Sequence, residues 1–225
     1  MVIVHLLTVS IFLNLGGIQI KITVVGGTGL VGQSILTELN RYPEYDLHSL
    51  SRTGRRKTSI PGVTYHATNL LSDTSWQQLV KDSDWVIDCV GILFENRRKQ
   101  ITYQNSSVLP AKKLIDTITD SANNFLYVSA NYAPFFLKDY LATKKEVELY
   151  AYSRLGQRAV CVFPGIVYSK KRLSNYYPAR IIANLIRTRC FNWLTKIRPI
   201  SSQAFAHEIL NIITGLPSPL RKRIP

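Results

Sequence analysis

Three side chains in the middle of the chain are of types that together can move a proton. Tyr140 and Lys144 are four residues apart, which places both on one face if the segment is helical. A lysine ammonium beside the phenol would lower the pKa of Tyr140 and make it a usable general acid. Ser129 precedes them, and its hydroxyl could hydrogen-bond a substrate carbonyl. These three are the predicted catalytic residues; the alternative is an ordinary surface pair of Tyr and Lys.

The elements that must position these side chains follow from the apolar pattern. Short runs rich in β-branched residues alternate with segments of helical spacing, which predicts an α/β fold, a doubly wound parallel sheet covered by helices on both faces. The predicted strands cover 20–25, 46–51, 62–66, 84–90, 125–129 and 158–163, and the predicted helices cover 30–40, 107–121, 137–154 and 202–213. Ser129 then ends the fifth strand, and Tyr140 and Lys144 lie on the helix after it.

A glycine-rich turn follows the first predicted strand. The segment Gly26–Gly32 reads GGTGLVG and opens a helix. Such a turn needs glycine for the tight bend, for close approach of the backbone to a pyrophosphate and for close packing of helix on strand. Free N–H groups at the helix start favour an anionic phosphate there. We therefore predict a Rossmann-type turn that binds a nicotinamide dinucleotide; the alternative is an ordinary glycine-rich turn.

The end of the second predicted strand indicates which dinucleotide is bound. An acid is usual there when the ribose carries a free 2′-hydroxyl, but this chain has Ser51 and Arg52, followed by Arg55 and Arg56. A guanidinium matches a 2′-phosphate, which favours NADP(H), with NAD(H) as the alternative. These charges could also be solvated loop residues. The predicted cofactor-binding residues are Gly26, Gly27, Thr28, Gly29, Leu30, Val31, Gly32, Ser51, Arg52, Val90, Gly91, Lys144 and Pro164.

The chain as a whole is strongly basic. It has 28 Lys and Arg against 14 Asp and Glu, a formal charge of +14. This charge suits an anionic partner, either a dinucleotide phosphate or an acidic membrane surface. No basic run is long enough for a nucleic-acid tail, so nucleic acid is not expected. Cys89, Cys161 and Cys190 form no CxxC pair and the four His are scattered, so no metal site is expected.

Three parts of the chain can be separated by composition. Residues 1–19 form a hydrophobic extension, too short to span a bilayer and without a cleavage site; an anchor, a pro-segment and an upstream extension all remain open. Residues 20–177 form the predicted Rossmann domain. Residues 178–225 form a small helical C-terminal part, in which a basic amphipathic helix over 179–196 fits an anionic lipid surface. Alternatively, its apolar face packs on the sheet.

Together with the glycine turn, several short sequence segments resemble those of the short-chain dehydrogenase/reductase family in its atypical, extended-like form. The resemblance covers roughly Lys21 to Leu210. These segments are Cys89–Gly91, Asn105, the YxxxK of Tyr140–Lys144 and Phe163–Gly165. The resemblance is greatest to two mitochondrial branches. One is the Rossmann-fold accessory subunit of respiratory complex I, and the other is a fungal relative that assists ubiquinone biosynthesis. The strings at 51–54, 90–95 and 198–200 resemble the fungal branch.

This resemblance implies an NADP(H)-binding protein on the matrix side of the mitochondrial inner membrane. It implies support of ubiquinone biosynthesis or respiratory-chain assembly within a protein complex, with weak or no catalysis. The short Ser129–Tyr140 gap and Phe163 in place of the family's usual Arg depart from active members. The alternatives are an active NADPH-dependent reductase or epimerase, an NmrA-like redox-sensing regulator, and a cytoplasmic location.

Overall fold

A six-stranded parallel sheet forms the centre of the molecule. The computed structural model describes residues 19–54, 59–169 and 199–224. The strand order is β3-β2-β1-β4-β5-β6, so the direction of winding reverses between β1 and β4. The strands are β1 (Ile20–Val25), β2 (Tyr45–Ser51), β3 (Val63–Ala67), β4 (Trp85–Asp88), β5 (Asn124–Val128) and β6 (Ala159–Val162). The predicted doubly wound parallel sheet is confirmed.

The helices agree with the prediction except at two places. They are α2 (Leu30–Leu39), α3 (Gln77–Lys81), α4 (Leu109–Thr117), α5 (Lys138–Leu155) and α7 (Ser202–Ile213). The helix expected over 107–121 begins as a π-helical turn, η2 (Gln104–Val108), and continues as α4. α4 starts just before Pro110, because proline is tolerated in the first turn of a helix but not in its interior. The sequence pattern missed α3, which is only five residues long.

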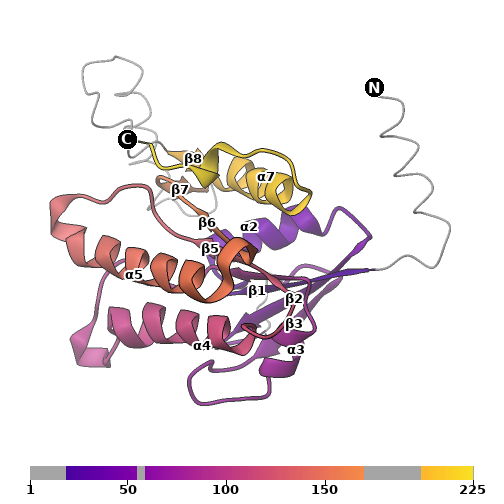
Figure 1. Cartoon of the computed structure of the whole chain (residues 1–225), viewed down its shortest axis with the longest axis horizontal. Coiled ribbons are helices and arrows are strands. Elements are labelled where there is room, and N and C mark those ends of the chain that lie inside the picture. Colours follow the sequence, from indigo (N-terminus) through magenta and orange to yellow (C-terminus); the bar gives the residue numbers. More distant parts are fainter. Residues whose placement is uncertain (1–18, 55–58, 170–198, 225) are drawn as a thin grey trace.

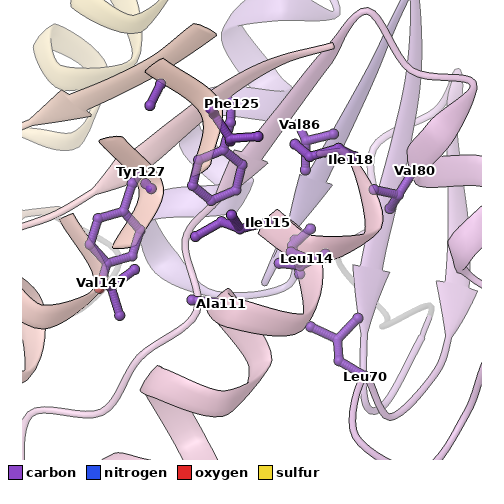
Figure 2. Packing of buried hydrophobic residues seen from close by; sticks show 14 of the residues in the cluster. Leu70, Val80, Val86, Ala111, Leu114, Ile115, Ile118, Phe125, Tyr127 and Val147 are labelled. Atoms are coloured by element: carbon purple, nitrogen blue, oxygen red, sulfur yellow. The ribbon is translucent and has the colours of Figure 1, made fainter. Parts of the chain in front are cut away.

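Alternation along β5 divides the core into two layers. Phe125 and Tyr127 face α4 and α5, whereas Leu126 and Val128 face α2 and α7. Figure 1 shows α2 and α7 on one side of the sheet and α4 and α5 on the other. Figure 2 shows the first layer, where Phe125 and Tyr127 pack over Ile115 and Val147. Because successive strand residues alternate, Ser129 follows on the α5 side.

The C-terminal part adds a short strand as well as the expected helix. β7 (Val167–Tyr168) pairs in parallel with β8 (Ile200–Ser201), and α7 then packs against α2. The Ser201 hydroxyl accepts a bond from the backbone N–H of Ala204 and so caps α7. Residues 1–18 of the predicted extension, Arg55, Arg56, the predicted helix over 179–196 and Cys190 lie outside the described residues.

Candidate functional site: a dinucleotide cavity beside a Tyr–Lys pair

The glycine turn between β1 and α2 has the geometry that a phosphate requires. Gly26 has a φ of +80°, and its carbonyl accepts the N–H of Gly29 at 2.9 Å. A Cβ on Gly32 would lie 2.5 Å from the Gly26 carbonyl oxygen, so only glycine lets the helix pack this closely. Gly27 is packed in the same way against the Ser49 side chain. The turn is therefore fixed by the strand and helix that it joins.

The start of α2 is open toward solvent. Gly29 is its N-cap and is exposed, and within the described residues no side chain caps this end of the helix. Its first N–H groups and the positive end of its dipole point out of the turn. The bare glycine backbone leaves a cradle that a side chain would fill. These features fit the pyrophosphate of a dinucleotide.

A cavity of about 550 Å³ opens at the carboxyl ends of β1, β2 and β4. Seven of the predicted cofactor residues line it: Gly26, Thr28, Gly29, Ser51, Arg52, Val90 and Gly91. It lies where the strand order reverses, which is the usual ligand position in a doubly wound sheet. The cavity therefore brings together the turn, the end of β2 and the end of β4.

Other predicted cofactor residues do not line this cavity. Gly27 and Gly32 are buried in helix–strand packing, and Val31 packs into the α2–α7 core layer. Pro164 is buried, and its carbonyl accepts the N–H of Asn131 at 3.0 Å. Leu30 and Lys144 are likewise outside the lining. For the two glycines the structure shows a role in shaping the turn; direct contact of these six residues with a cofactor stays a prediction.

The cavity also has lining residues that the sequence analysis did not assign. Most come from the segments after β3 and after β4: Thr68, Asn69, Leu70, Leu71, Cys89, Ile92, Lys99, Gln100, Ile101, Asn105, Ser106 and Pro110. Val25 and Leu50 come from β1 and β2, and Thr53 comes from the turn after β2. Asn69 could have been found as a polar residue just past a predicted parallel strand. Most of the others come from segments whose path past the cavity only the tertiary structure gives.

The end of β2 carries no acid. Ser51 lines the cavity, its carbonyl accepts the N–H groups of Gly54 and Thr68, and Arg52 is exposed beside it. A carboxylate that could hold a free ribose 2′-hydroxyl is absent from the described residues lining the cavity. The position that distinguishes the two dinucleotides is therefore basic in this chain.

Tyr140 and Lys144 share one face of α5, as predicted. Lys144 is 5% exposed, and its Nζ donates to the Val128 carbonyl at 2.8 Å. That Nζ lies 4.6 Å from the centroid of the Tyr127 ring and 6.0 Å from that of the Tyr140 ring. A Cβ on Gly91 would be 3.3 Å from it, so the lysine reaches the backbone after β4. Lys144 thus lies between β5 and the edge of the cavity.

The expected effect of Lys144 on Tyr140 is wrong. Burial, and to a smaller extent the nearby Tyr103, raise the pKa of Tyr140 to about 12. Burial also lowers the pKa of Lys144. The physical reason is that the ammonium faces the Val128 carbonyl and the Tyr127 ring, so desolvation of the phenolate outweighs its attraction to the lysine.

Ser129 is engaged elsewhere. The residue is 3% exposed, and its hydroxyl donates to the carboxylate of Glu148, one turn beyond Lys144 on α5. Arg223 binds the same carboxylate with Nη2 at 2.7 and 2.8 Å, and its Nη1 donates to the Ala130 carbonyl at 2.8 Å. The predicted bond from Ser129 to a substrate carbonyl would require the Glu148 bond to break. The structure therefore brings Tyr140 and Lys144 together but ties Ser129 to a separate ion pair, in which Glu148 is buried and Arg223 is partly exposed.

Asp88, at the end of β4, is a charged residue that the sequence analysis placed only within a strand. It is fully buried; its Oδ1 accepts the Val90 N–H at 2.8 Å, and its Oδ2 has no partner among the described residues. Desolvation raises the pKa of Asp88 to about 6, although the Val90 N–H and Lys144 act in the opposite direction. Asp88 therefore holds in place the backbone segment that lines the cavity.

Within residues 19–54, 59–169 and 199–224, no three His, Cys, Asp or Glu side chains are grouped so as to hold a metal ion. No helix in these ranges is long and apolar enough to cross a bilayer.

The doubly wound sheet, its glycine turn and the cavity at the reversal point define a Rossmann-type dinucleotide-binding protein. Residues 22–189 match the model of the NAD dependent epimerase/dehydratase family. The match covers well over half of the sequence, and the chain belongs to this family. Comparison with curated protein sequences finds no significant match.

Solved structures confirm the fold. A UDP-galactose 4-epimerase is 17% identical, with a TM-score of 0.63 over 86% of this chain and 72% of the other. The UDP-glucuronic acid 4-epimerase from Bacillus cereus, solved in complex with NAD, is 16% identical, with a TM-score of 0.59 over 74% of this chain and 63% of its own. A short chain dehydrogenase family protein from Francisella tularensis subsp. tularensis SCHU S4 is 14% identical, with a TM-score of 0.58 over 86% of this chain and 90% of its own.

These similarities are to the fold alone. The chain spans less than two thirds of the length of several of the matched sugar-nucleotide enzymes, among them the B. cereus epimerase.

Proposed function

We propose that this chain binds NADP(H) in preference to NAD(H) and that its own catalysis is weak or absent. The observation that carries the proposal is the cavity itself, in which Arg52 and no described carboxylate stand at the end of β2. The bond between Ser129 and Glu148 and the raised pKa of Tyr140 favour cofactor binding over turnover. The residues that would hold the cofactor are the turn from Gly26 to Gly29, Arg52 and the Val90–Gly91 segment.

The cofactor preference is tested by titrating the purified protein with NADPH and with NADH while following tryptophan fluorescence. A guanidinium bound to a phosphate contributes about 1.5–3 kcal/mol. Arg52→Ala should therefore weaken NADPH binding about tenfold to a hundredfold and leave NADH binding nearly unchanged. Arg41→Ala, another exposed arginine but outside the cavity, is the matched control. Equal binding of both dinucleotides by the native chain would refute the preference.

The cellular role is part of the same proposal. We infer a mitochondrial protein on the matrix side of the inner membrane that supports ubiquinone biosynthesis or respiratory-chain assembly, in a protein complex and in contact with anionic lipid. Support comes from the strings at 51–54, 90–95 and 198–200 and from the charge of +14. Cell fractionation and capture of partners from mitochondria would test it, and a wholly cytoplasmic distribution would refute it.

A second candidate function is an active NADPH-dependent reductase or epimerase. It is favoured by the position of Tyr140 and Lys144 on one face of α5, with Lys144 at the backbone of Gly91. A bound nicotinamide would supply or accept the hydride. Tyr140 would hold and move the proton, and the buried Lys144 ammonium would orient the site.

Complementation of a deletion strain separates the two functions. Tyr140→Phe keeps the ring and removes only the hydroxyl, so it should abolish an activity that uses Tyr140 as an acid and leave cofactor affinity intact. Tyr150→Phe, on the same helix but with its hydroxyl on Asp116 at 2.6 Å, is the matched control. Full complementation by Tyr140→Phe would exclude catalysis by this residue and favour the binding function.

A further inference from the structure

Four large apolar side chains are exposed at the carboxyl edge of the sheet. Phe135 is 86% exposed, Phe136 65%, Phe94 63% and Leu93 48%. The three phenylalanines are the most exposed large apolar side chains among the described residues. We call these four residues the apolar tip. Large apolar side chains exposed together at one edge of a fold are typical of a site of interaction.

A pair of neighbouring tyrosines, Tyr103 and Tyr140, links the two segments that carry the tip. Phe135 and Phe136 belong to the short helix η3 (Phe135–Leu137), which leads directly into α5 and is anchored by the buried Leu137. Leu93 and Phe94 lie in the loop after β4, where the Tyr103 hydroxyl donates to the Leu93 carbonyl at 2.9 Å. The Tyr103 ring lies 6.3 Å from the ring of Tyr140 in the first turn of α5. Figure 1 shows both segments at the left end of the molecule.

Basic residues surround the tip. Arg97, Arg98 and Lys99 form the short helix η1 (Arg97–Lys99), all three exposed, and Lys138 is exposed at the start of α5. The loop that carries η1 is closed by the Asn96–Ile101 bridge, so the charges are displayed by an ordered segment. Of these four cations, only Arg97 has a carboxylate of the described residues within ion-pair distance, Glu95 at 3.8 Å.

The charge and the shape of this surface identify its partner. The aromatic rings project from two turns and carry no polar end, which suits insertion among lipid acyl chains. The cations beside them suit the phosphates of anionic lipid headgroups. We propose that the apolar tip and the surrounding cations dock the protein on the surface of an anionic lipid bilayer. The inference deepens the membrane contact proposed above, on which it rests, and it does not depend on any reaction.

Docking through this surface orients the site. Tyr140 and the backbone of Gly91 belong to the same carboxyl edge of the sheet as the tip. The protein would therefore turn this edge, and with it the mouth of the cavity, toward the lipid.

Vesicle sedimentation of the whole chain tests the proposal, with phosphatidylcholine vesicles that either contain or lack phosphatidylglycerol. Binding is expected only with phosphatidylglycerol and should weaken as salt increases. Phe135→Ala/Phe136→Ala should weaken it at least about tenfold through lost acyl contact. Arg97→Gln/Arg98→Gln/Lys138→Gln should do the same through lost attraction. Lys99 is left unchanged because it lines the cavity.

Matched controls remove the same groups elsewhere. Leu149→Ala/Leu216→Ala removes two exposed apolar side chains, 61% and 51% exposed, outside the tip. Arg41→Gln/Lys81→Gln/Arg154→Gln removes three cations at the carboxyl ends of helices, on the opposite edge of the sheet. Both controls should bind the vesicles as the native chain does.

Four outcomes would overturn the inference. The native chain could fail to bind phosphatidylglycerol vesicles, the tip variants could bind them as well as the native chain does, or the tip variants and the controls could lose binding equally. The fourth is a concentration-dependent dimer that Phe135→Ala/Phe136→Ala abolishes. NADPH titration of the same samples separates the proposals. A chain that binds NADPH but not vesicles disproves the membrane contact alone, and tip variants that still bind vesicles disprove this surface alone.

Discussion

Replacing Asp88 with Asn should stabilise the protein at neutral and alkaline pH. Asp88 is fully buried, and desolvation raises its pKa from 3.8 to about 6. The native state therefore holds the proton more tightly than the unfolded state does. The contribution of Asp88 to the free energy of unfolding is fully present below about pH 4. It falls as the pH rises to about 6 and stays low above that.

The size of the effect follows from the same values. A rise in pKa from 3.8 to about 6 corresponds to roughly 3 kcal/mol of lost stability once the carboxylate is ionised. Asn keeps an oxygen for the Val90 N–H, but its amide replaces the unpartnered Oδ2 with unpartnered donors, which costs about 1 kcal/mol. We expect Asp88→Asn to be more stable by about 2 kcal/mol at pH 8.

Urea unfolding followed by tryptophan fluorescence measures this difference. The two proteins should differ most at pH 8, and at pH 4 the variant should have no advantage. Asp120→Asn, an exposed aspartate in the loop after α4, shows how much of any change comes from net charge alone. A variant that is less stable than the native chain at pH 8, or that has the same pH dependence, would refute the reasoning.

Two further predictions concern packing and the C-terminal ion pair. Gly32→Ala places a Cβ 2.5 Å from a backbone oxygen and should lower the free energy of unfolding by about 1–3 kcal/mol. Because the turn would shift, the same variant should also bind the dinucleotide more weakly. Gly29→Ala meets its nearest atom at 3.2 Å, so its thermal unfolding should change much less; an equal loss would contradict the packing argument. Arg223→Ala leaves the nearly buried Glu148 without its counter-ion and should cost about 2 kcal/mol in urea unfolding. The exposed Arg221→Ala is its control, and equal effects of the two would count against the ion pair.

The fold could be predicted from the sequence because its signals are local. The β-branched run before Gly26 predicts both ends of β1 correctly, and the apolar spacing does the same for α7 at Ser202–Ile213. The pattern missed α3 and the β7–β8 pair because elements of five and two residues are too short to show a period.

The candidate site could be predicted only in part. The turn from Gly26 to Gly29 was recognised because a phosphate turn is one continuous segment, and the structure confirms that this segment lines a cavity. The loop residues that complete the cavity were missed, because they come from separate segments that only the fold brings together. Asp88 gave no signal as a special residue, since its burial depends on what packs around the end of β4.

The sequence by itself determined the order of strands and helices, the glycine turn and the common face of Tyr140 and Lys144. Each of these features depends only on residues that are close together along the chain. Only the tertiary structure decided the bonding partners and the pKa values of the predicted catalytic side chains. It brings Arg223 to Glu148 and Glu148 to Ser129. It also surrounds much of Tyr140 with protein, so that the pKa of Tyr140 rises where the i, i+4 spacing alone suggested a fall. Desolvation depends on every element that packs around a group, and that information is not present in the spacing of residues along the chain.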